Sequence, residues 1–230
     1  MKRLVLLPGM DGTGELFADF QQAVSGKCQT TVLRYPADRF LSYSQLLDYI
    51  SAYVPADEPF TLLAESFSTP LAIQFAVSNP TGLRALVLCA GFVTCPVNYW
   101  LGLMAGVAAR FAFQMKLPDF AVDFLLGPAP PADLVVALRS AISSTSPRVL
   151  SRRLQAVLTC DARADLSRLT VPTLYIQARH DRLVRPQCLK EMQRIKPDIN
   201  VTAIDGSHLI LQQEPIEAAE AIMEFISKAG

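Results

Sequence analysis

The chain has 230 residues, of which 51% are hydrophobic and 18% are charged. Its 21 basic residues balance its 21 acidic residues, so no strong field favours nucleic acid or an anionic membrane. This length suits one domain with a large core, and the expected partner is a small neutral or apolar molecule.

Short apolar segments alternate with amphipathic segments along most of the chain. The expected strands are Leu4–Leu7, Thr31–Tyr35, Phe60–Ala64, Ala85–Cys89, Thr173–Gln177 and Asn200–Ile204. The expected helices are Leu16–Val24, Tyr43–Val54, Thr69–Val77, Cys188–Ile195 and Glu214–Ser227. Val- and Leu-rich strands that alternate with helices indicate an α/β fold, with a mostly parallel sheet covered on both faces.

A glycine-rich loop follows the first expected strand and reads Pro8-Gly9-Met10-Asp11-Gly12-Thr13-Gly14. Glycines allow backbone N–H groups to face a ligand. The order G-x-x-G-x-G reverses the dinucleotide fingerprint, and the P-loop spacing from Gly9 to Gly14 continues with Glu15 instead of lysine. Arg34, near the end of the second expected strand, suits a 2′-phosphate, so an NADP-binding reductase stays an alternative.

The segment Ala64-Glu65-Ser66-Phe67-Ser68 lies where a strand is expected to end and a helix to begin. A nucleophile elbow has this position, with small residues two before and two after the serine because strand and helix pass close together. The alternative is a serine that only caps the helix. Glu65 is either a supporting residue near the serine or simply exposed.

The alternation stops between residues 91 and about 162, where the chain becomes helical and aromatic-rich. We interpret this segment as a helical lid inserted into a single domain whose core is 1–90 and 163–230. Its aromatic side chains are candidates for an acyl pocket, although packing against the core explains them equally well: Trp100, Phe111, Phe113, Phe120 and Phe124.

Only two histidines are present, and His208 follows the last expected strand, where a loop can reach the carboxyl edge of the sheet. Asp181 comes after the fifth expected strand and can orient His208 from the same edge. The neighbouring His180 is expected to point the other way. Competing acids are Asp161, Asp165 and Asp205.

The cysteines and the apolar stretches bear on the compartment. Five cysteines without a C-x-x-C pair indicate buried thiols and no zinc cluster, and the apolar run Leu4–Leu7 is too short for a signal peptide, so the cytoplasm is expected. Tyr99–Phe113 covers about 15 residues, fewer than the roughly 20 of a spanning helix, so no stable membrane insertion is expected. The cysteines are Cys28, Cys89, Cys95, Cys160 and Cys188.

With the glycine loop and the chain order Ser66, Asp181, His208, the sequence resembles the α/β-hydrolase superfamily, especially small lid-bearing carboxylesterases. Nearly the whole chain takes part. The elbow lacks the usual glycines, and the first two strands of the family pattern are missing, so the resemblance implies a sheet of about six strands. It also implies an oxyanion hole formed by the backbone N–H groups of Met10 and Phe67.

The resulting hypothesis is a serine esterase that cleaves esters of small to medium acyl chain through an acyl-enzyme, with no metal or organic cofactor. A thioesterase, a carbon–carbon bond hydrolase or an acyltransferase would use the same three residues. A non-catalytic ligand-binding protein is a further alternative.

Overall fold

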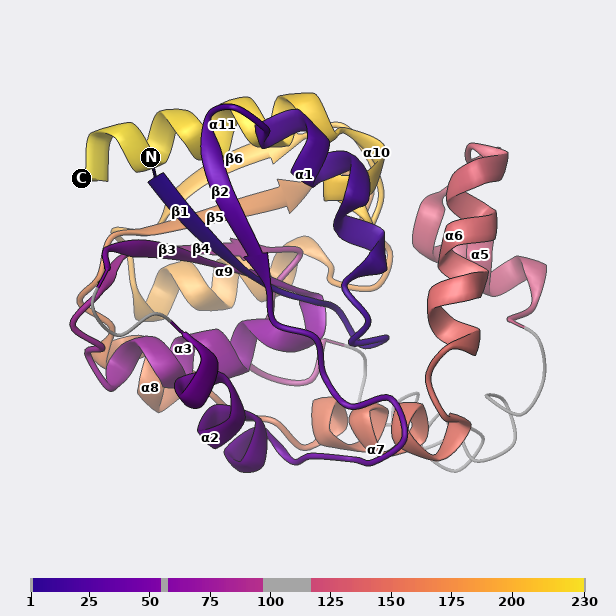
Figure 1. Ribbon diagram of the computed structural model, residues 1–230, viewed down its shortest axis with the longest axis horizontal. Coiled ribbons are helices and arrows are strands. Elements are labelled where there is room, and N and C mark those ends of the chain that lie inside the picture. Colours follow the sequence, from indigo (N-terminus) through magenta and orange to yellow (C-terminus); the bar gives the residue numbers. More distant parts are fainter. Residues whose placement is uncertain (1, 55–57, 97–116, 230) are drawn as a thin grey trace.

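The structure, a computed structural model, describes residues 2–54, 58–96 and 117–229. Its strands form one sheet in the order β2-β1-β3-β4-β5-β6, and every neighbouring pair is parallel (Figure 1). The expectation of a parallel sheet of about six strands is therefore confirmed. The strands are β1 (Lys2–Leu7), β2 (Cys28–Val32), β3 (Phe60–Glu65), β4 (Leu83–Cys89), β5 (Thr173–Ala178) and β6 (Asn200–Ile204).

Helices cover both faces of the sheet (Figure 1). One face packs against α1 (Ala18–Val24) and α11 (Pro215–Ala229), which bury Phe20, Val24 and Ile222. The opposite face is covered by α2 (Tyr43–Tyr53), α3 (Thr69–Val77), α8 (Arg163–Arg168) and α9 (Pro186–Ile195). Because β1, β3 and β4 are apolar on both faces, they occupy the centre of the sheet.

The second strand is β2 (Cys28–Val32), so its predicted position at Thr31–Tyr35 is wrong by three residues. This edge strand is half-exposed and rich in polar side chains, so its sequence lacks the apolar run by which the other strands were predicted. Leu33 and Tyr35 are buried after the strand has ended, and the amide of Tyr35 donates to the Gly12 carbonyl at 2.8 Å. Burial of alternate residues in this loop therefore resembled strand periodicity.

Between β4 and β5 the described chain forms α5 (Asp119–Leu126), α6 (Ala132–Ser143) and α7 (Pro147–Leu158) before α8. Gly127 ends α5 with φ of 76°, and three prolines precede α6. Figure 1 places α5 and α6 beyond the carboxyl ends of the strands. They share a small apolar core with Leu16, in η1 (Glu15–Phe17), and with Leu209.

In the part of the chain that the structure describes, we found no helix with both the length and the apolar character needed to cross a bilayer.

Candidate active site

Ser66 stands where β3 meets the short helix η2 (Ser66–Ser68). Its φ is 48°, a left-handed conformation that non-glycine residues rarely adopt, and such backbone strain is concentrated at functional sites. The tight turn directs the chain from β3 straight into α3. The serine therefore occupies the strained strand-to-helix junction that the sequence indicated.

The two positions around Ser66 where glycine is usual are filled without disturbing the turn. Ala64 is fully buried in β3, and Ser68 is fully buried in η2. The Ser68 hydroxyl lies 2.5 Å from the Pro8 carbonyl oxygen, its acceptor, and 2.6 Å from the Tyr35 hydroxyl. These polar contacts compensate the burial of a hydroxyl at this position.

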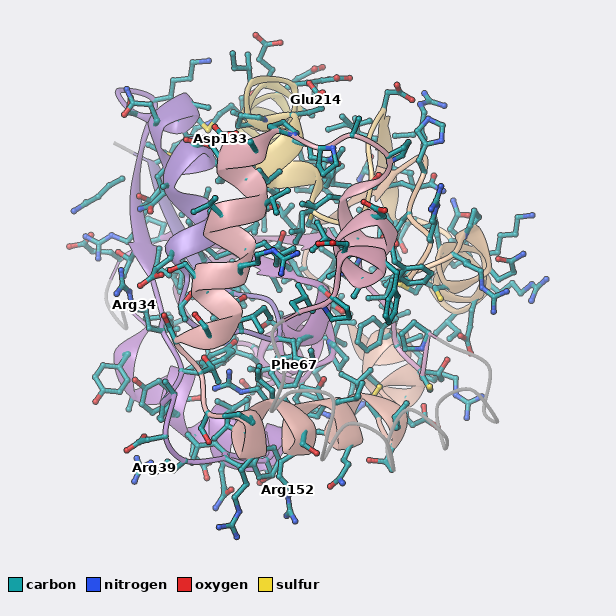
Figure 2. All side chains as sticks on the ribbon, turned by 90° about the vertical axis from the view of Figure 1, so that its right-hand side faces the viewer. Arg34, Arg39, Phe67, Asp133, Arg152 and Glu214 are labelled. Carbon is teal, nitrogen blue, oxygen red and sulfur yellow. The ribbon has the colours of Figure 1, made fainter. Side chains whose placement is uncertain are left out.

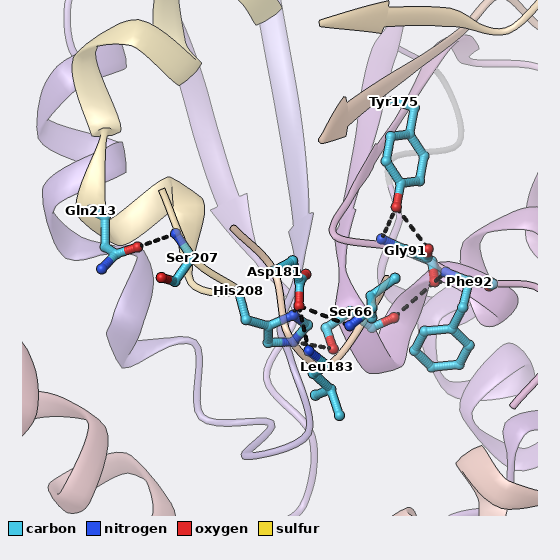
Figure 3. Close-up of polar contacts among 11 residues, drawn as sticks. Ser66, Gly91, Phe92, Tyr175, Asp181, Leu183, Ser207, His208 and Gln213 are labelled. Atoms are coloured by element: carbon cyan, nitrogen blue, oxygen red, sulfur yellow. Dashed lines mark hydrogen bonds and ion pairs between the residues drawn. The ribbon is translucent and has the colours of Figure 1, made fainter. Parts of the chain in front are cut away.

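Ser66, His208 and Asp181 lie in one hydrogen-bonded line at the carboxyl edge of the sheet (Figure 3). His208 Nε2 is 2.9 Å from Ser66 Oγ, and His208 Nδ1 is 2.8 Å from Asp181 Oδ2. The other Asp181 oxygen, Oδ1, accepts the amides of Leu183 and Val184, each at 2.8 Å. Asp181 is thus held by its own turn while it orients the imidazole.

The loop that carries His208 is held from two sides. Gln213, in α10 (Ile210–Gln213), accepts the Ser207 amide at 2.7 Å and donates to the Leu126 carbonyl at 2.7 Å. The His208 amide donates to the Leu125 carbonyl at 3.1 Å. The end of α5 therefore fixes the position of the histidine loop, which links the inserted helices directly to the site.

Charge and burial have opposite effects on the pKa of His208, whose exposed fraction is 3%. Burial alone would lower its pKa, but the charge of Asp181 and the hydrogen bond to it raise the pKa above its usual value. Glu65 also favours the protonated imidazole. The site thus stabilises the imidazolium that would form when His208 takes a proton.

Glu65 is 2% exposed, so the interpretation as an exposed residue is wrong. Burial raises its pKa to about 7, although a hydrogen bond from Gln212 and the nearby His208 oppose this shift. Gln212 Nε2 lies 3.4 Å from Glu65 Oε2, while Oε1 is buried with no partner among the described residues. With this pKa the carboxyl group is about half protonated at neutral pH.

The glycine-rich loop is folded on itself. Asp11 Oδ1 accepts the Thr13 amide at 2.8 Å, and the Gly12 amide donates to the Gly9 carbonyl at 3.1 Å. These amides are therefore used within the loop instead of facing a phosphate. Figure 2 shows Arg34 at the periphery of the face in view, and its side chain lies beside the loop, since a Cβ on Gly14 would be 3.8 Å from its Cγ.

Arg153 supports this loop from α7, a role that the sequence reasoning missed. It is 1% exposed, and its guanidinium donates to the carbonyls of Met10, Asp11 and Pro36 at 2.9, 2.7 and 2.9 Å. Burial lowers its pKa, while Tyr35 and Asp11 oppose the shift. A basic residue on the apolar face of an amphipathic helix was the available sequence signal.

A cavity of about 210 Å³ opens above Ser66 and His208 and is bounded by Gly9, Met10, Glu65 and Phe67. The inserted helices supply the aliphatic part of its wall, with Leu125, Leu138, Ile142, Leu154, Val157 and Leu158. No Lys or Arg side chain is among the described residues that line it. The cavity suits an uncharged, apolar group placed next to the serine.

Of the aromatic side chains predicted for this pocket, the two that the structure describes do not line it. Phe120 and Phe124 are 76% and 40% exposed and lie outside the cavity, because α5 turns Val122 and Leu126 inward instead. Trp100, Phe111 and Phe113 lie outside the described residues.

The competing acids have other partners. His180 pairs with Asp205 at 2.8 Å on the surface, while Asp161 and Asp165 pair with neighbouring arginines. Within the described ranges, His, Cys, Asp and Glu side chains do not gather into a group that could hold a metal ion.

Comparison with known protein families gives one match over most of the chain. Residues 38–214 match the family of serine aminopeptidases, S33. The chain belongs to this family. Its fold and its hydrolase class are therefore those of the α/β-hydrolases, as the resemblance in the sequence implied.

The relatives of this S33 family member are distant. A pyrrolizixenacetamide deacetylase from Xenorhabdus hominickii is 23% identical over 73% of the chain, which spans 65% of that protein's length. A pimeloyl-[acyl-carrier protein] methyl ester esterase from Neisseria meningitidis serogroup C is 23% identical over 95% of the chain and 87% of that protein. A hydrolase from Oleispira antarctica has a similar fold, with a TM-score of 0.87 at 14% identity, over 99% of this chain and 91% of its own.

Proposed function

We propose that the protein hydrolyses carboxylic esters of small to medium acyl chain through an acyl-enzyme on Ser66. The observation that carries this proposal is the line from Ser66 through His208 to Asp181, with distances of 2.9 and 2.8 Å, at the strained end of β3. The arrangement matches the geometry by which a serine, a base and an orienting acid cleave acyl groups.

In this mechanism His208 Nε2 takes the Ser66 proton as Oγ attacks the ester carbonyl. The amides of Met10 and Phe67 donate to the oxyanion, and removal of one such donor typically costs ~10²-fold or more in turnover. His208 then gives its proton to the leaving alcohol. Water repeats the sequence on the acyl-enzyme and releases the acid.

The cavity supports the substrate class. Its volume of about 210 Å³ and its largely aliphatic wall suit the hydrocarbon part of a small to medium acyl chain. The Neisseria relative is a methyl ester esterase, which agrees with ester cleavage in the same family.

The nucleophile is tested by covalent labelling with a fluorophosphonate, followed by mass spectrometry of the labelled peptide. We expect the label on Ser66 and its complete loss in Ser66→Ala. The matched control is Ser68→Ala, two residues along the chain, which should keep the label on Ser66. A label on another residue, or none on the wild type, would contradict the proposal.

The bond that is cleaved needs a substrate panel. Hexanoyl esters of p-nitrophenol, a hexanoyl thioester and an alcohol acceptor, assayed with wild type and Ser66→Ala, distinguish an esterase from a thioesterase or an acyltransferase. We expect the highest kcat/KM with the ester and at least a 10³-fold loss in Ser66→Ala, roughly the scale on which triad residues act. Equal turnover of the ester by both proteins would contradict the assignment.

A further inference from the structure

An isolated antiparallel bridge joins the chain on the two sides of the inserted helices. Thr94, after β4, pairs with Asp161, after α7. The Ala162 amide donates to the Val93 carbonyl at 2.8 Å and fixes the register. In an antiparallel pair one step forward on one segment faces one step back on the other, so Cys95 stands opposite Cys160.

The spacing of opposite residues suits a disulfide. Residues directly opposite one another in an antiparallel pair typically have Cα atoms about 4.5–5.5 Å apart and side chains on the same face. A disulfide needs a Cα separation of about 4.4–6.8 Å. Both cysteines are half-buried, which corrects the expectation that all five are buried, whereas Cys28, Cys89 and Cys188 do lie in the interior.

The electrostatic surroundings agree with this proximity. Burial raises the pKa of Cys160 to about 12, and the next largest cause is Cys95, followed by Asp161 and Glu191. Glu191 is held in place by a hydrogen bond from the Thr94 hydroxyl at 2.8 Å. A high thiol pKa keeps the thiolate scarce at neutral pH, so oxidation of this pair should accelerate as the pH rises.

We propose that Cys95 and Cys160 are an oxidisable pair whose disulfide cross-links the two ends of the inserted segment. With a small-molecule disulfide as oxidant, one cysteine thiolate attacks it and releases one small thiol. The second cysteine thiolate then attacks the mixed disulfide and releases the other. The two protein thiols lose two electrons and two protons, and the small disulfide gains them.

The cross-link affects the cavity, a consequence that rests on the proposed function. Cys95 precedes Pro96 and Cys160 follows Leu158 by two residues, and both Pro96 and Leu158 line the cavity. Tying the two segments together prevents these walls from moving apart. Oxidation should therefore lower kcat/KM more for an ester whose acyl chain is longer than the cavity accommodates than for an ester whose chain fits.

The test is incubation of the whole protein with oxidised glutathione at pH 8.5, followed by alkylation, proteolysis and mass spectrometry. We expect a peptide linked through Cys95 and Cys160, its loss in Cys95→Ser, and its retention in Cys188→Ser, the matched buried control. Glutathione adducts on both cysteines without a link between them, or a link to another cysteine, would overturn the proposal.

Two further measurements, of Tm and of kcat/KM, test what the cross-link does to stability and to substrate preference. Closing a loop of this length should raise Tm by about 8–16 °C, reversibly with dithiothreitol and only where Cys95 is present. In the oxidised protein kcat/KM for a dodecanoyl ester should fall at least threefold more than for a hexanoyl ester. An unchanged Tm would overturn the cross-link. Because the linked peptide and Tm do not depend on catalysis, they decide the matter even if no ester is cleaved.

Discussion

The side chain of Asp181 divides its two oxygens between two tasks. Oδ1 binds the amides of Leu183 and Val184, while Oδ2 faces His208 Nδ1. Both tasks require an acceptor. An amide in place of the carboxylate can satisfy the turn with its oxygen, but it then presents an N–H group to the imidazole.

Asp181→Asn should therefore leave the fold intact and hold His208 in the wrong tautomer, with Nε2 protonated toward Ser66. We expect kcat to fall by about 10³- to 10⁴-fold, the scale of this change in other triads. Steady-state ester hydrolysis measures it. The matched control is Asp205→Asn, at the surface pair with His180, which should stay within twofold. A loss below tenfold for Asp181→Asn would argue against its role.

Glu65 makes stability depend on pH in a direction unusual for a carboxylate. Its pKa is about 7 in the folded state, above the ordinary value of 4.5. Between these values the folded chain keeps the proton and the unfolded chain releases it, so the folded state binds more protons. Wild-type stability should then fall as pH rises from 4.5 to about 7.

Glu65→Gln removes this ionisation while keeping the size of the side chain. At roughly 1.4 kcal/mol per pKa unit, the free energy of unfolding of the variant relative to wild type should rise by roughly 3 kcal/mol between pH 4.5 and pH 8. Urea denaturation at a series of pH values measures this difference. Glu220→Gln, on the exposed side of α11, should show a difference that stays constant. A flat curve for Glu65→Gln as well would disprove the linkage.

At the scale of elements, the glycine loop depends on α7. The buried guanidinium of Arg153 donates to two carbonyls of this loop and to that of Pro36, and a Cβ on Gly12, whose φ is 73°, would lie 2.5 Å from one of its nitrogens. The loop and the helix are therefore fitted closely. This contact couples the inserted segment to the backbone that carries the Met10 amide.

Arg153→Met should leave the carbonyls of Met10 and Pro36 without a donor. The Asp11 carbonyl keeps the Thr145 hydroxyl at 2.7 Å. We expect a loss of about 3 kcal/mol in the free energy of unfolding, because buried acceptors without partners cost about 1–3 kcal/mol each. Turnover of the folded protein should fall at least tenfold, since displacement by about 1 Å costs up to 10²-fold. Chemical denaturation and ester hydrolysis measure the two effects.

The neighbouring Arg152 supplies the control, because it projects from the outer side of α7 (Figure 2) and lies 5.1 Å from the Phe40 ring. Arg152→Met should change stability by less than 1 kcal/mol, as expected for an exposed charge. If both arginine variants behaved alike, the loop would not depend on Arg153.

The elements that the sequence predicted well are those in which burial and periodicity agree. The helix Thr69–Val77 was placed correctly because an almost wholly buried helix follows an almost wholly buried strand. The edge strand β2 was misplaced because polar residues form it and buried loop residues follow it. The local sequence pattern therefore identifies core elements, but it fails where the residues that form a strand are not the residues that are buried.

The residues of the candidate site also differ in how well the sequence could predict them. Ser66, Asp181 and His208 could be brought together from the sequence, because the chain has only two histidines and Asp181 follows the fifth expected strand at the same edge of the sheet. The positions of Phe120 and Arg153 could not, because which side of an inserted helix faces the core depends on packing that only the folded chain defines. Large side chains were a misleading guide to the cavity wall.

At the scale of the whole molecule, the proposed reaction site lies between the parallel sheet and the inserted helices. The sheet supplies the serine and the loops that carry its partners, whereas α5, α6 and α7 supply most of the aliphatic wall. The small core around Leu126, Leu138 and Leu209 holds the two together. Acyl-chain length should therefore be set by the inserted helices and chemistry by the sheet.

Ile142→Phe tests this division, because the residue lines the cavity from α6 and its apolar side chain takes no part in the hydrogen bond between Ser66 and His208. The larger ring should displace two or three carbon atoms of a bound chain. Since about 1–3 kcal/mol accompanies each methylene lost from a pocket, kcat/KM for a hexanoyl ester should fall at least tenfold, while an acetyl ester changes less than twofold.

Val136→Phe is the matched control, since Val136 lies on the same helix and is 67% exposed. It should leave the ratio of hexanoyl to acetyl kcat/KM unchanged. An equal loss for both esters in Ile142→Phe would mean that α6 affects the chemistry itself. Because α5 holds the His208 loop through Leu125, such a loss would arise if repacking of the inserted helices moved the histidine.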